Sequence, residues 1–161
     1  MIYCIADLHL GHINLALHRG FQDVEEHDEL IISNWNKTVS KKDVVYILGD
    51  ITMEKDLYSK YLPKLNGIKN VVLGNHDMPQ HVASLLKYVN KIMGMFDLKE
   101  GTLTHCPIHP IEIQNGRFRF NIHGHIHEEK IDNERYICVS CEQVNYTPVS
   151  LNELIIKFEN E

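Results

Sequence analysis

Residues 44–77 read VVYILGDITMEKDLYSKYLPKLNGIKNVVLGNHD. The stretch begins with the apolar run Val44–Leu48 and ends with a second apolar run, Asn70–Leu73, and both runs have the length and composition of strands. Between them, apolar residues recur at helical spacing over residues 57–65, in a helix that Pro63 is expected to kink or end early. A strand, a helix and a second strand in this order predict parallel strands joined by a right-handed crossover.

The same pattern continues on both sides of this stretch. Met1–Ala6 is an apolar, strand-like run, and Asp23 is placed to cap a helix whose apolar residues follow to position 39. Glu26, three residues after Asp23, suits a capping box. Pro79 suits the first turn of a further helix that extends to position 89. The first half of the chain therefore predicts the order β-α-β-α-β-α.

The second half changes to short strands. We expect them near residues 92–98, 102–104, 117–122 and 136–139, and residues 150–158 fit either a short helix or an edge strand. No repeat, low-complexity tract or linker interrupts the 161 residues, so one domain over residues 1–161 is the simplest organisation. We expect an α/β (α+β) fold in which two sheets pack together with helices outside, and the pairing within the second sheet stays open.

Composition limits the function classes. Apolar residues make up 43% and charged residues 24% of the chain, as in soluble globular proteins. The net charge of −6 argues against sequence-independent binding to nucleic acid or to an anionic membrane. We find no signal peptide and no apolar run of membrane-spanning length. The four cysteines lack the density of a secreted disulfide scaffold, so we expect reduced thiols in a cytoplasmic protein.

Polar residues that suit metal binding follow directly after the expected strands. Since the carboxyl ends of strands converge on the ligand crevice of an open α/β sheet, we expect these residues to meet. The glycines among them allow tight turns beside a ligand without a Cβ in the way. Two pairs have i, i+2 spacing, which on an extended chain points both side chains the same way. The clusters are Asp7 and His9, Gly49-Asp50, Gly74-Asn75-His76-Asp77, His105, and Gly124-His125 with His127.

These five blocks, in this order, resemble those of the calcineurin-like metallophosphoesterase superfamily, and the small single-domain prokaryotic and phage members above all. The resemblance covers residues 7–127. It implies a four-layer α/β/β/α sandwich, with two mixed sheets packed face to face and flanked by helices. It also implies enzymatic hydrolysis of a phosphoric ester.

The resemblance further implies two metal ions that share one carboxylate. Asp50 would bridge them, and mixed imidazole and oxygen ligands suit the divalent transition metals Mn, Fe, Zn, Ni or Co. Bridged ions about 3.5–4 Å apart support in-line displacement at phosphorus. The implied ligands of the first ion are Asp7, His9, Asp50 and His127, and those of the second are Asp50, Asn75, His105 and His125.

A mechanism follows from this resemblance. A metal-bound hydroxide attacks the phosphorus, and His76 is the implied general acid for the departing alcohol, a role that suits imidazole. No partner that orients His76 is evident, and Asp77 fits equally well as a cap for the helix that begins at Pro79. In the loop after the first strand, His12, Asn14 and Arg19 are candidates for substrate contacts, although an ordinary polar loop explains them about as well.

We therefore expect a phosphomonoesterase or phosphodiesterase that acts on a small phosphorylated molecule, for example a nucleotide. A protein Ser/Thr phosphatase fits less well, because that branch has an acidic residue and an arginine soon after the residue that matches Asp50. A nuclease would usually bring a basic groove, which the acidic composition does not suggest. The alternative from another class is a catalytically silent interaction module, in which eroded ligands are usual. The sequence does not indicate the oligomeric state.

Overall fold

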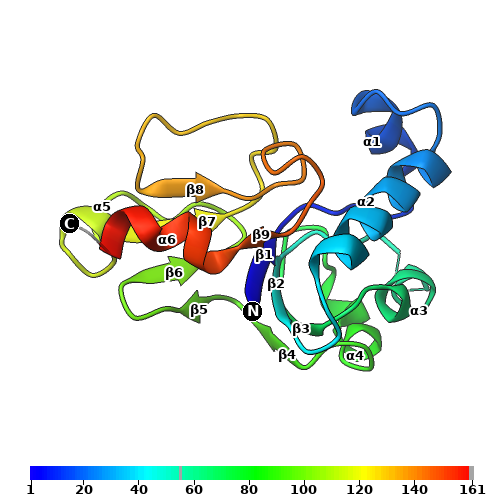
Figure 1. Cartoon of the computed structure of the whole chain (residues 1–161), viewed down its shortest axis with the longest axis horizontal. Helices are drawn as coiled ribbons and strands as arrows, with labels where there is room; N and C mark the ends of the chain where they lie inside the picture. Colours follow the sequence, from blue (N-terminus) through cyan, green and yellow to red (C-terminus); the bar gives the residue numbers. More distant parts are fainter. Residues whose placement is uncertain (55, 160–161) are drawn as a thin grey trace.

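The computed structural model describes residues 1–54 and 56–159 and contains two β-sheets (Figure 1). The first sheet has the strand order β4-β3-β2-β1-β9, in which β1 to β4 pair in parallel and β9 runs antiparallel to β1. Its strands are β1 (Ile2–Ile5), β2 (Val44–Leu48), β3 (Ile68–Val72), β4 (Lys91–Met93) and β9 (Val149–Ser150). The parallel pairing expected from the β-α-β order is confirmed.

The second sheet has the order β5-β6-β7-β8. β5 is antiparallel to β6, whereas β6, β7 and β8 are parallel to one another. These strands are β5 (Phe96–Asp97), β6 (Gly101–Leu103), β7 (Phe120–His123) and β8 (Tyr136–Cys138). Both sheets are mixed, as expected, and the fold is of the mixed α/β class.

Six α-helices and two 3-10 helices occur in the part of the chain that the structure describes. The α-helices are α1 (Ile13–His18), α2 (Val24–Thr38), α3 (Leu57–Tyr61), α4 (Val82–Leu85), α5 (Ile111–Gln114) and α6 (Leu151–Glu159). The 3-10 helices are Leu62–Lys64 and Pro79–His81. None of the described helices is long and apolar enough to cross a lipid bilayer.

The cap of α2 is as expected, with one difference. The Asp23 side chain accepts a hydrogen bond of 2.8 Å from the backbone N–H of Glu26. The Glu26 carboxylate accepts one of 2.8 Å from the N–H of Gln22, one position before the residue of a standard capping box. Two otherwise unpaired backbone donors are therefore satisfied where the helix begins.

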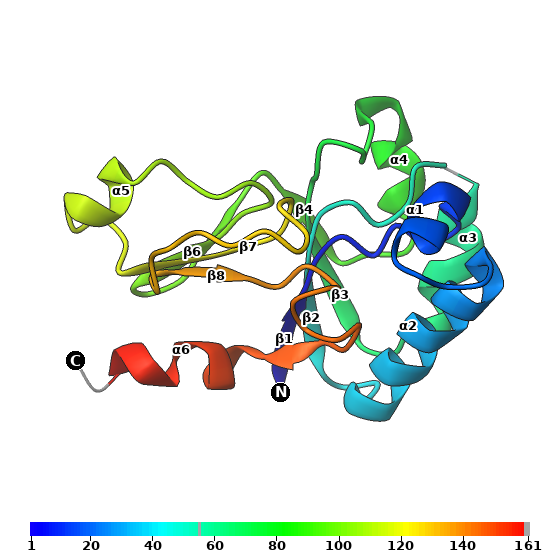
Figure 2. The same ribbon diagram turned by 90° about the horizontal axis from the view of Figure 1, so that it is seen from above.

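Successive side chains along the strands of the first sheet point to opposite faces, and each face contributes to a separate hydrophobic core. On one face, β1 and β2 residues such as Tyr3 and Ile47 pack with α2 and α3, through Trp35 among others. On the other face, residues such as Cys4 and Leu48 share a core with the second sheet and with α6. Figures 1 and 2 show α6 beside the second sheet and α2 and α3 on the far side of the first sheet.

Four expectations about the elements were wrong. The helix expected from Pro79 to position 89 is a 3-10 helix at Pro79–His81 followed by α4, which ends at Leu85. The strand expected at residues 92–98 is two strands, β4 and β5, because the chain leaves the first sheet at Gly94 and enters the second. Residues 13–18, expected as a loop, form α1, whose cap is the His12 ring that accepts from the N–H of Leu15 at 3.0 Å. Residues 117–119 lie outside β7. Over residues 150–158, both alternatives occur: β9 pairs with β1 and α6 follows it.

Candidate metal centre

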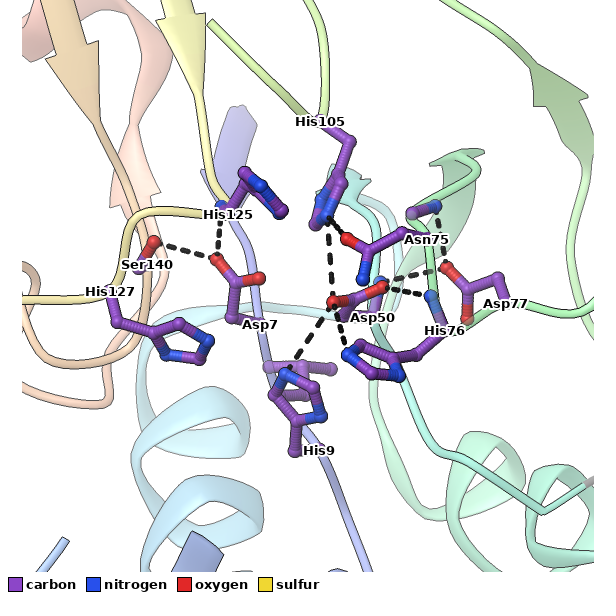
Figure 3. A network of polar contacts seen from close by, with 12 residues as sticks. Asp7, His9, Asp50, Asn75, His76, Asp77, His105, His125, His127 and Ser140 are labelled. Atoms are coloured by element: carbon purple, nitrogen blue, oxygen red, sulfur yellow. Dashed lines mark hydrogen bonds and ion pairs between the residues drawn. The ribbon is translucent and has the colours of Figure 1, made fainter.

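Loops at the carboxyl ends of strands from both sheets meet in one place. The strands are β1, β2 and β3 of the first sheet and β6 and β7 of the second, and their loops carry every residue for which a metal ligand or catalytic role is expected (Figure 3). Parallel strands bring their carboxyl ends to the same edge, which is why positions far apart in sequence become neighbours. The residues that meet are Asp7, His9, Asp50, Asn75, His76, His105, His125 and His127.

One group of candidate ligands lies on the β1 side. Asp7, His9 and His127 each offer a ligand atom within 4.8 Å of the other two. The His9 ring stacks on that of His127 with centroids 5.4 Å apart, and His9 Nε2 lies 3.6 Å from Oδ2 of Asp50. These four residues are the set expected for the first ion.

A second group lies on the β3 and β6 side. Oδ2 of Asp50 is 3.5 Å from Nε2 of His105, and the same nitrogen is 2.8 Å from Oδ1 of Asn75. His105 Nδ1 donates to the Leu48 carbonyl at 2.8 Å, which leaves the lone pair of the neutral ring on Nε2. The His125 ring lies 5.0 Å from that of His105, centroid to centroid. Asp50 is thus next to both groups, the position of a shared ligand.

Buried polar atoms without partners show that this centre fits a cation. Oδ1 of Asp7 and both ring nitrogens of His9 are buried and make no hydrogen bond to the residues that the structure describes. Such atoms cost about 1–3 kcal/mol each when nothing compensates them, and native structures contain few of them. A cation at this position would satisfy atoms on both residues, so the residues can hold metal ions.

The charges of the centre support the same conclusion. Burial, with help from the Arg19 guanidinium, lowers the pKa of His9 to about 2, so the ring is neutral and keeps a lone pair for an ion. Burial also raises the pKa of Asp50, and nearby Asp7 adds to this although His105 opposes it. A neighbouring cation would stabilise both carboxylates.

Five of the candidate ligands have left-handed backbone conformations. Their φ angles are 56° at Asp7, 46° at His9, 54° at Asp50, 74° at His125 and 51° at His127. Over the described residues only Asn145 and Tyr146 share this feature outside glycine. A non-glycine residue held this way costs of order 1–3 kcal/mol, and such residues cluster at functional sites.

This backbone corrects the expectation for the i, i+2 pairs, which assumed extended chain. Asp7 and His9 do face the same group. His125 and His127, however, separate, because His125 lies with His105 whereas His127 lies with Asp7 and His9. Left-handed residues turn the chain between the two side chains, so alternation does not apply. His125 and His127 therefore lie in different groups of candidate ligands.

Glycines next to the ligands are required for close approach, as expected. A Cβ on Gly74 would lie 2.1 Å from Oδ1 of Asp50. A Cβ on Gly49 would lie 2.5 Å from the His105 ring, and one on Gly124 would lie 2.6 Å from Oδ2 of Asp7. At these positions any larger residue would displace a ligand.

Asp77 organises the loops instead of capping a helix. Its Oδ2 accepts from the backbone N–H of Asp50 at 2.7 Å and of Gly74 at 2.9 Å, and its Oδ1 accepts from the N–H of Ile51 at 3.2 Å. The 3-10 helix that begins at Pro79 has no side-chain cap. The capping alternative for Asp77 is therefore wrong: this buried carboxylate ties the loop after β2 to the loop after β3.

Glu142 and Ser140 support the ligands and were missed by sequence reasoning. Oε1 of Glu142 accepts from His127 Nδ1 at 2.8 Å, which leaves the other ring nitrogen of His127 as its candidate ligand atom. Ser140 Oγ donates to Oδ2 of Asp7 at 2.6 Å. Both residues follow β8 in a stretch without a recognisable motif, so no sequence signal pointed to them.

Arg19 has a different place from the one expected. The expectation that it contacts substrate is wrong, because its side chain is only 1% exposed. Its guanidinium donates to the Asp7 carbonyl at 2.8 Å, to the Leu8 carbonyl at 3.3 Å and to Glu142 at 2.7 Å. Arg19 therefore stabilises the strained loop after β1 through hydrogen bonds to its backbone carbonyls.

His76, His12 and Asn14 line a surface hollow beside the first ligand group. Together with residues of α1 and the first ligand group they line an open hollow of about 280 Å³. His12 and Asn14 also line an adjoining hollow of about 330 Å³ beside α3. The His76 side chain is 40% exposed, and its Nε2 lies 4.0 Å from Oδ2 of Asp50, which is too far for a hydrogen bond. The ring contacts that of His9 edge-on at 5.4 Å.

Comparison with known proteins gives relatives without an assigned activity. No protein-family model matches the chain. Gene 66 proteins of Mycobacterium phages L5 and D29 are 39% and 36% identical over 79 and 83 residues, which cover 46% and 48% of this chain and 38% and 41% of theirs. The crystal structure of AQ665 from Aquifex aeolicus, a protein of unknown function, matches with a TM-score of 0.78 and 26% identity over 98% of both chains.

A longer sequence match comes from Methanocaldococcus jannaschii. Its uncharacterized protein MJ1445 is 35% identical over 174 residues, which cover 97% of this chain and 89% of MJ1445. None of these relatives is named for an activity, so the resemblance to metallophosphoesterases stays a prediction. Identity at this level over nearly the whole of both chains shows that the protein described here belongs to the same family as MJ1445.

Proposed function

We propose that this protein is a metal-dependent phosphoesterase of the calcineurin-like type, which hydrolyses a phosphomonoester or phosphodiester of a small molecule. One observation carries the proposal: two groups of candidate ligands converge from five loops around Asp50, with buried unpaired atoms and strained backbone at the same residues. Unpaired buried atoms and strained backbone are energetically unfavourable, and folded proteins retain such features at functional sites. The two mixed sheets and their helices are compatible with the four-layer α/β/β/α sandwich of that superfamily.

The ligand sets divide between two ions as the resemblance implies. Asp7, His9 and His127 would hold the first, Asn75, His105 and His125 would hold the second, and Asp50 would be shared. Imidazole and oxygen donors in this mixture suit Mn, Fe, Zn, Ni or Co, whereas Mg and Ca prefer oxygen alone. A pair of divalent ions, when bound, supplies positive charge that polarises phosphoryl oxygens and activates water.

The substrate class follows from charge and shape. Two divalent ions bring four positive charges and the carboxylates of Asp7 and Asp50 return two, so the centre is positive in a chain of net charge −6. Such a centre attracts a phosphate, while the remaining surface repels long polyanions. Small hollows of about 280 and 330 Å³ suit a small ester better than a nucleic acid.

Within this proposal His76 has the position of a proton donor to the leaving group. Its exposed ring faces the hollow beside His9, and its backbone N–H donates to Oδ1 of Asp50 at 2.9 Å, which ties it to the centre. His12 and Asn14, on the boundary of the two hollows, would contact the part of the substrate beyond the phosphate. The four cysteines are free thiols, which supports the proposed cytoplasmic location.

The test is an activity matrix of metals against substrates. Protein loaded with each candidate metal is assayed on p-nitrophenyl phosphate, its bis-ester and cyclic nucleotides. We expect hydrolysis that Asp50→Asn abolishes and that Asp97→Asn, the same change at an exposed position of β5, leaves intact. If the pure protein binds no transition metal and gains no activity on its addition, the interaction module becomes the better explanation.

A further inference from the structure

A cysteine lies beside the second ligand group. His105, Cys106 and His125 each offer a ligand atom within 4.8 Å of the other two. The resemblance assigns the two histidines to the second ion and gives Cys106 no role. Figure 3 shows the rings of His105 and His125 next to each other, above Asp50.

The backbone explains how two consecutive residues face the same group. In a straight strand neighbouring side chains point to opposite faces. Here the chain bends at His105 and Cys106, directly after β6. The bend is held by the Thr104 hydroxyl, which donates to the Cys106 carbonyl at 2.6 Å, and by the N–H of Gly124, which donates to the His105 carbonyl at 2.9 Å.

The side chains at this position are available to an ion. Cys106 is a free, exposed thiol, and His125 is also exposed. No hydrogen bond or ion pair within residues 1–54 and 56–159 engages the Cys106 sulfur or the His125 ring. Independently, Oδ1 of Asp7 is buried without a partner, and a carboxylate oxygen of Asp7 lies within 4.8 Å of a ring nitrogen of His105. Asp7 belongs to the first ligand group and its carboxylate also lies near His105 of the second, so its unpaired oxygen suits a cation within this centre.

We propose that Cys106 binds the second ion as a thiolate, together with His105 and His125; this inference rests on the proposed function. The sulfur loses its proton to solvent as the S–metal bond forms, so the charge of the loaded centre falls from +2 to +1. A soft thiolate favours Zn, Fe or Co at this position over Mn or Mg. The ligand atoms of all three residues already lie within 4.8 Å of one another, the spacing that a common ion requires.

X-ray absorption at the zinc edge tests this directly. A zinc–sulfur bond is about 2.3 Å long, whereas zinc–nitrogen and zinc–oxygen bonds are about 2.0–2.2 Å. In the full chain loaded with two zinc ions, we expect one sulfur neighbour for every two ions. Cys106→Ser should lose this sulfur shell, and Cys138→Ser should keep it. Cobalt loading gives a second readout, a sulfur-to-cobalt charge-transfer band in the wild type that Cys106→Ser lacks.

The outcomes separate this inference from the proposed function. Two bound zinc ions with only nitrogen and oxygen neighbours would overturn the role of Cys106 and leave the phosphoesterase proposal standing. A sulfur shell that persists in Cys106→Ser would overturn it as well. A protein that binds neither zinc nor any other of the candidate transition metals would overturn both. Because Cys106 is exposed, the variant is expected to fold, and its thermal unfolding transition checks this.

Discussion

Glu142 accepts hydrogen bonds from two side chains next to the candidate metal centre, Arg19 and His127, and Glu142→Gln removes its charge while keeping its shape. The carboxylate accepts from Arg19 Nε at 2.7 Å and from His127 Nδ1 at 2.8 Å, and its side chain is 13% exposed. Burial works against the ionised form, but the hydrogen bond from His127 and the charge of Arg19 outweigh it and lower the pKa of Glu142 to about 2.

The expected size of the effect follows from this pKa. The difference between the ordinary value of 4.5 and about 2 corresponds to about 3 kcal/mol of folding free energy. Because the folded-state pKa is the lower one, the ionised carboxylate stabilises the protein fully above pH 4.5. This stabilisation is lost as the pH falls toward 2, and about half of it should remain near pH 3.

Urea unfolding of the metal-free protein at pH 7 and pH 3 measures this effect. The control is Glu128→Gln, the same substitution at a side chain that is 63% exposed and lies 3.9 Å from His18. We expect the control to change stability by less than about 0.5 kcal/mol. The reasoning is refuted if Glu142→Gln and Glu128→Gln unfold alike at pH 7, or if the loss in Glu142→Gln is the same at both pH values.

Metal affinity gives a second readout for the same variant. Because Glu142 orients the ring of His127, its loss should weaken binding at the first ion by about 10–100-fold in titration calorimetry. The exposed control should bind as the wild type does. Equal affinities in both variants would show that His127 needs no orienting partner.

Three further predictions concern the centre itself. Gly74→Ala places a Cβ 2.1 Å from Oδ1 of Asp50, so we expect loss of bound metal and lower stability, whereas Gly94→Ala, with no atom within 4 Å, should leave both unchanged in metal analysis and thermal unfolding. His76→Gln should lower the hydrolysis rate by about 10²–10⁴-fold with full metal content; a normal rate would exclude His76 as the proton donor. Chelation should lower the melting temperature, since an ion at 100 times its Kd stabilises the native state by about 2.7 kcal/mol, and an unchanged temperature would contradict binding at this centre.

Much of the fold was predictable because it follows from residue patterns within short segments of the sequence. The apolar run Val44–Leu48, the helical spacing after it and the following apolar run predicted parallel strands in the first sheet, and the observed pairing agrees. The second sheet was harder to predict, since three of its strands, β5, β6 and β8, have only two or three residues and show little pattern. Nothing in residues 92–98 shows that the chain changes sheets at Gly94, because pairing partners are chosen by distant segments.

For the candidate site too, features that depend on short segments were predictable, whereas features that depend on distant segments were not. Sequence blocks pointed to the Asp, Asn and His residues that meet in the candidate metal centre, because metal ligands are of a few residue types and these lie just after strands. They did not point to Cys106, Ser140 or Glu142. They pointed wrongly to Arg19, because charge and position in a loop do not reveal burial. The side-chain directions expected for the i, i+2 pairs assumed extended backbone, which is wrong. The sequence does not show that a non-glycine residue has a left-handed backbone, such as the φ of 74° at His125.

By itself, the sequence determined which side chains can bind a metal and the strand ends on which they lie, because residue chemistry and local periodicity are properties of short segments. Only the tertiary structure decided what supports them: Arg19 and Glu142 are 123 positions apart yet 2.7 Å from each other. It also decided that Cys106 faces the second ligand group. Contacts of this kind depend on how the two sheets pack, and the free energy of that packing is shared by the whole core.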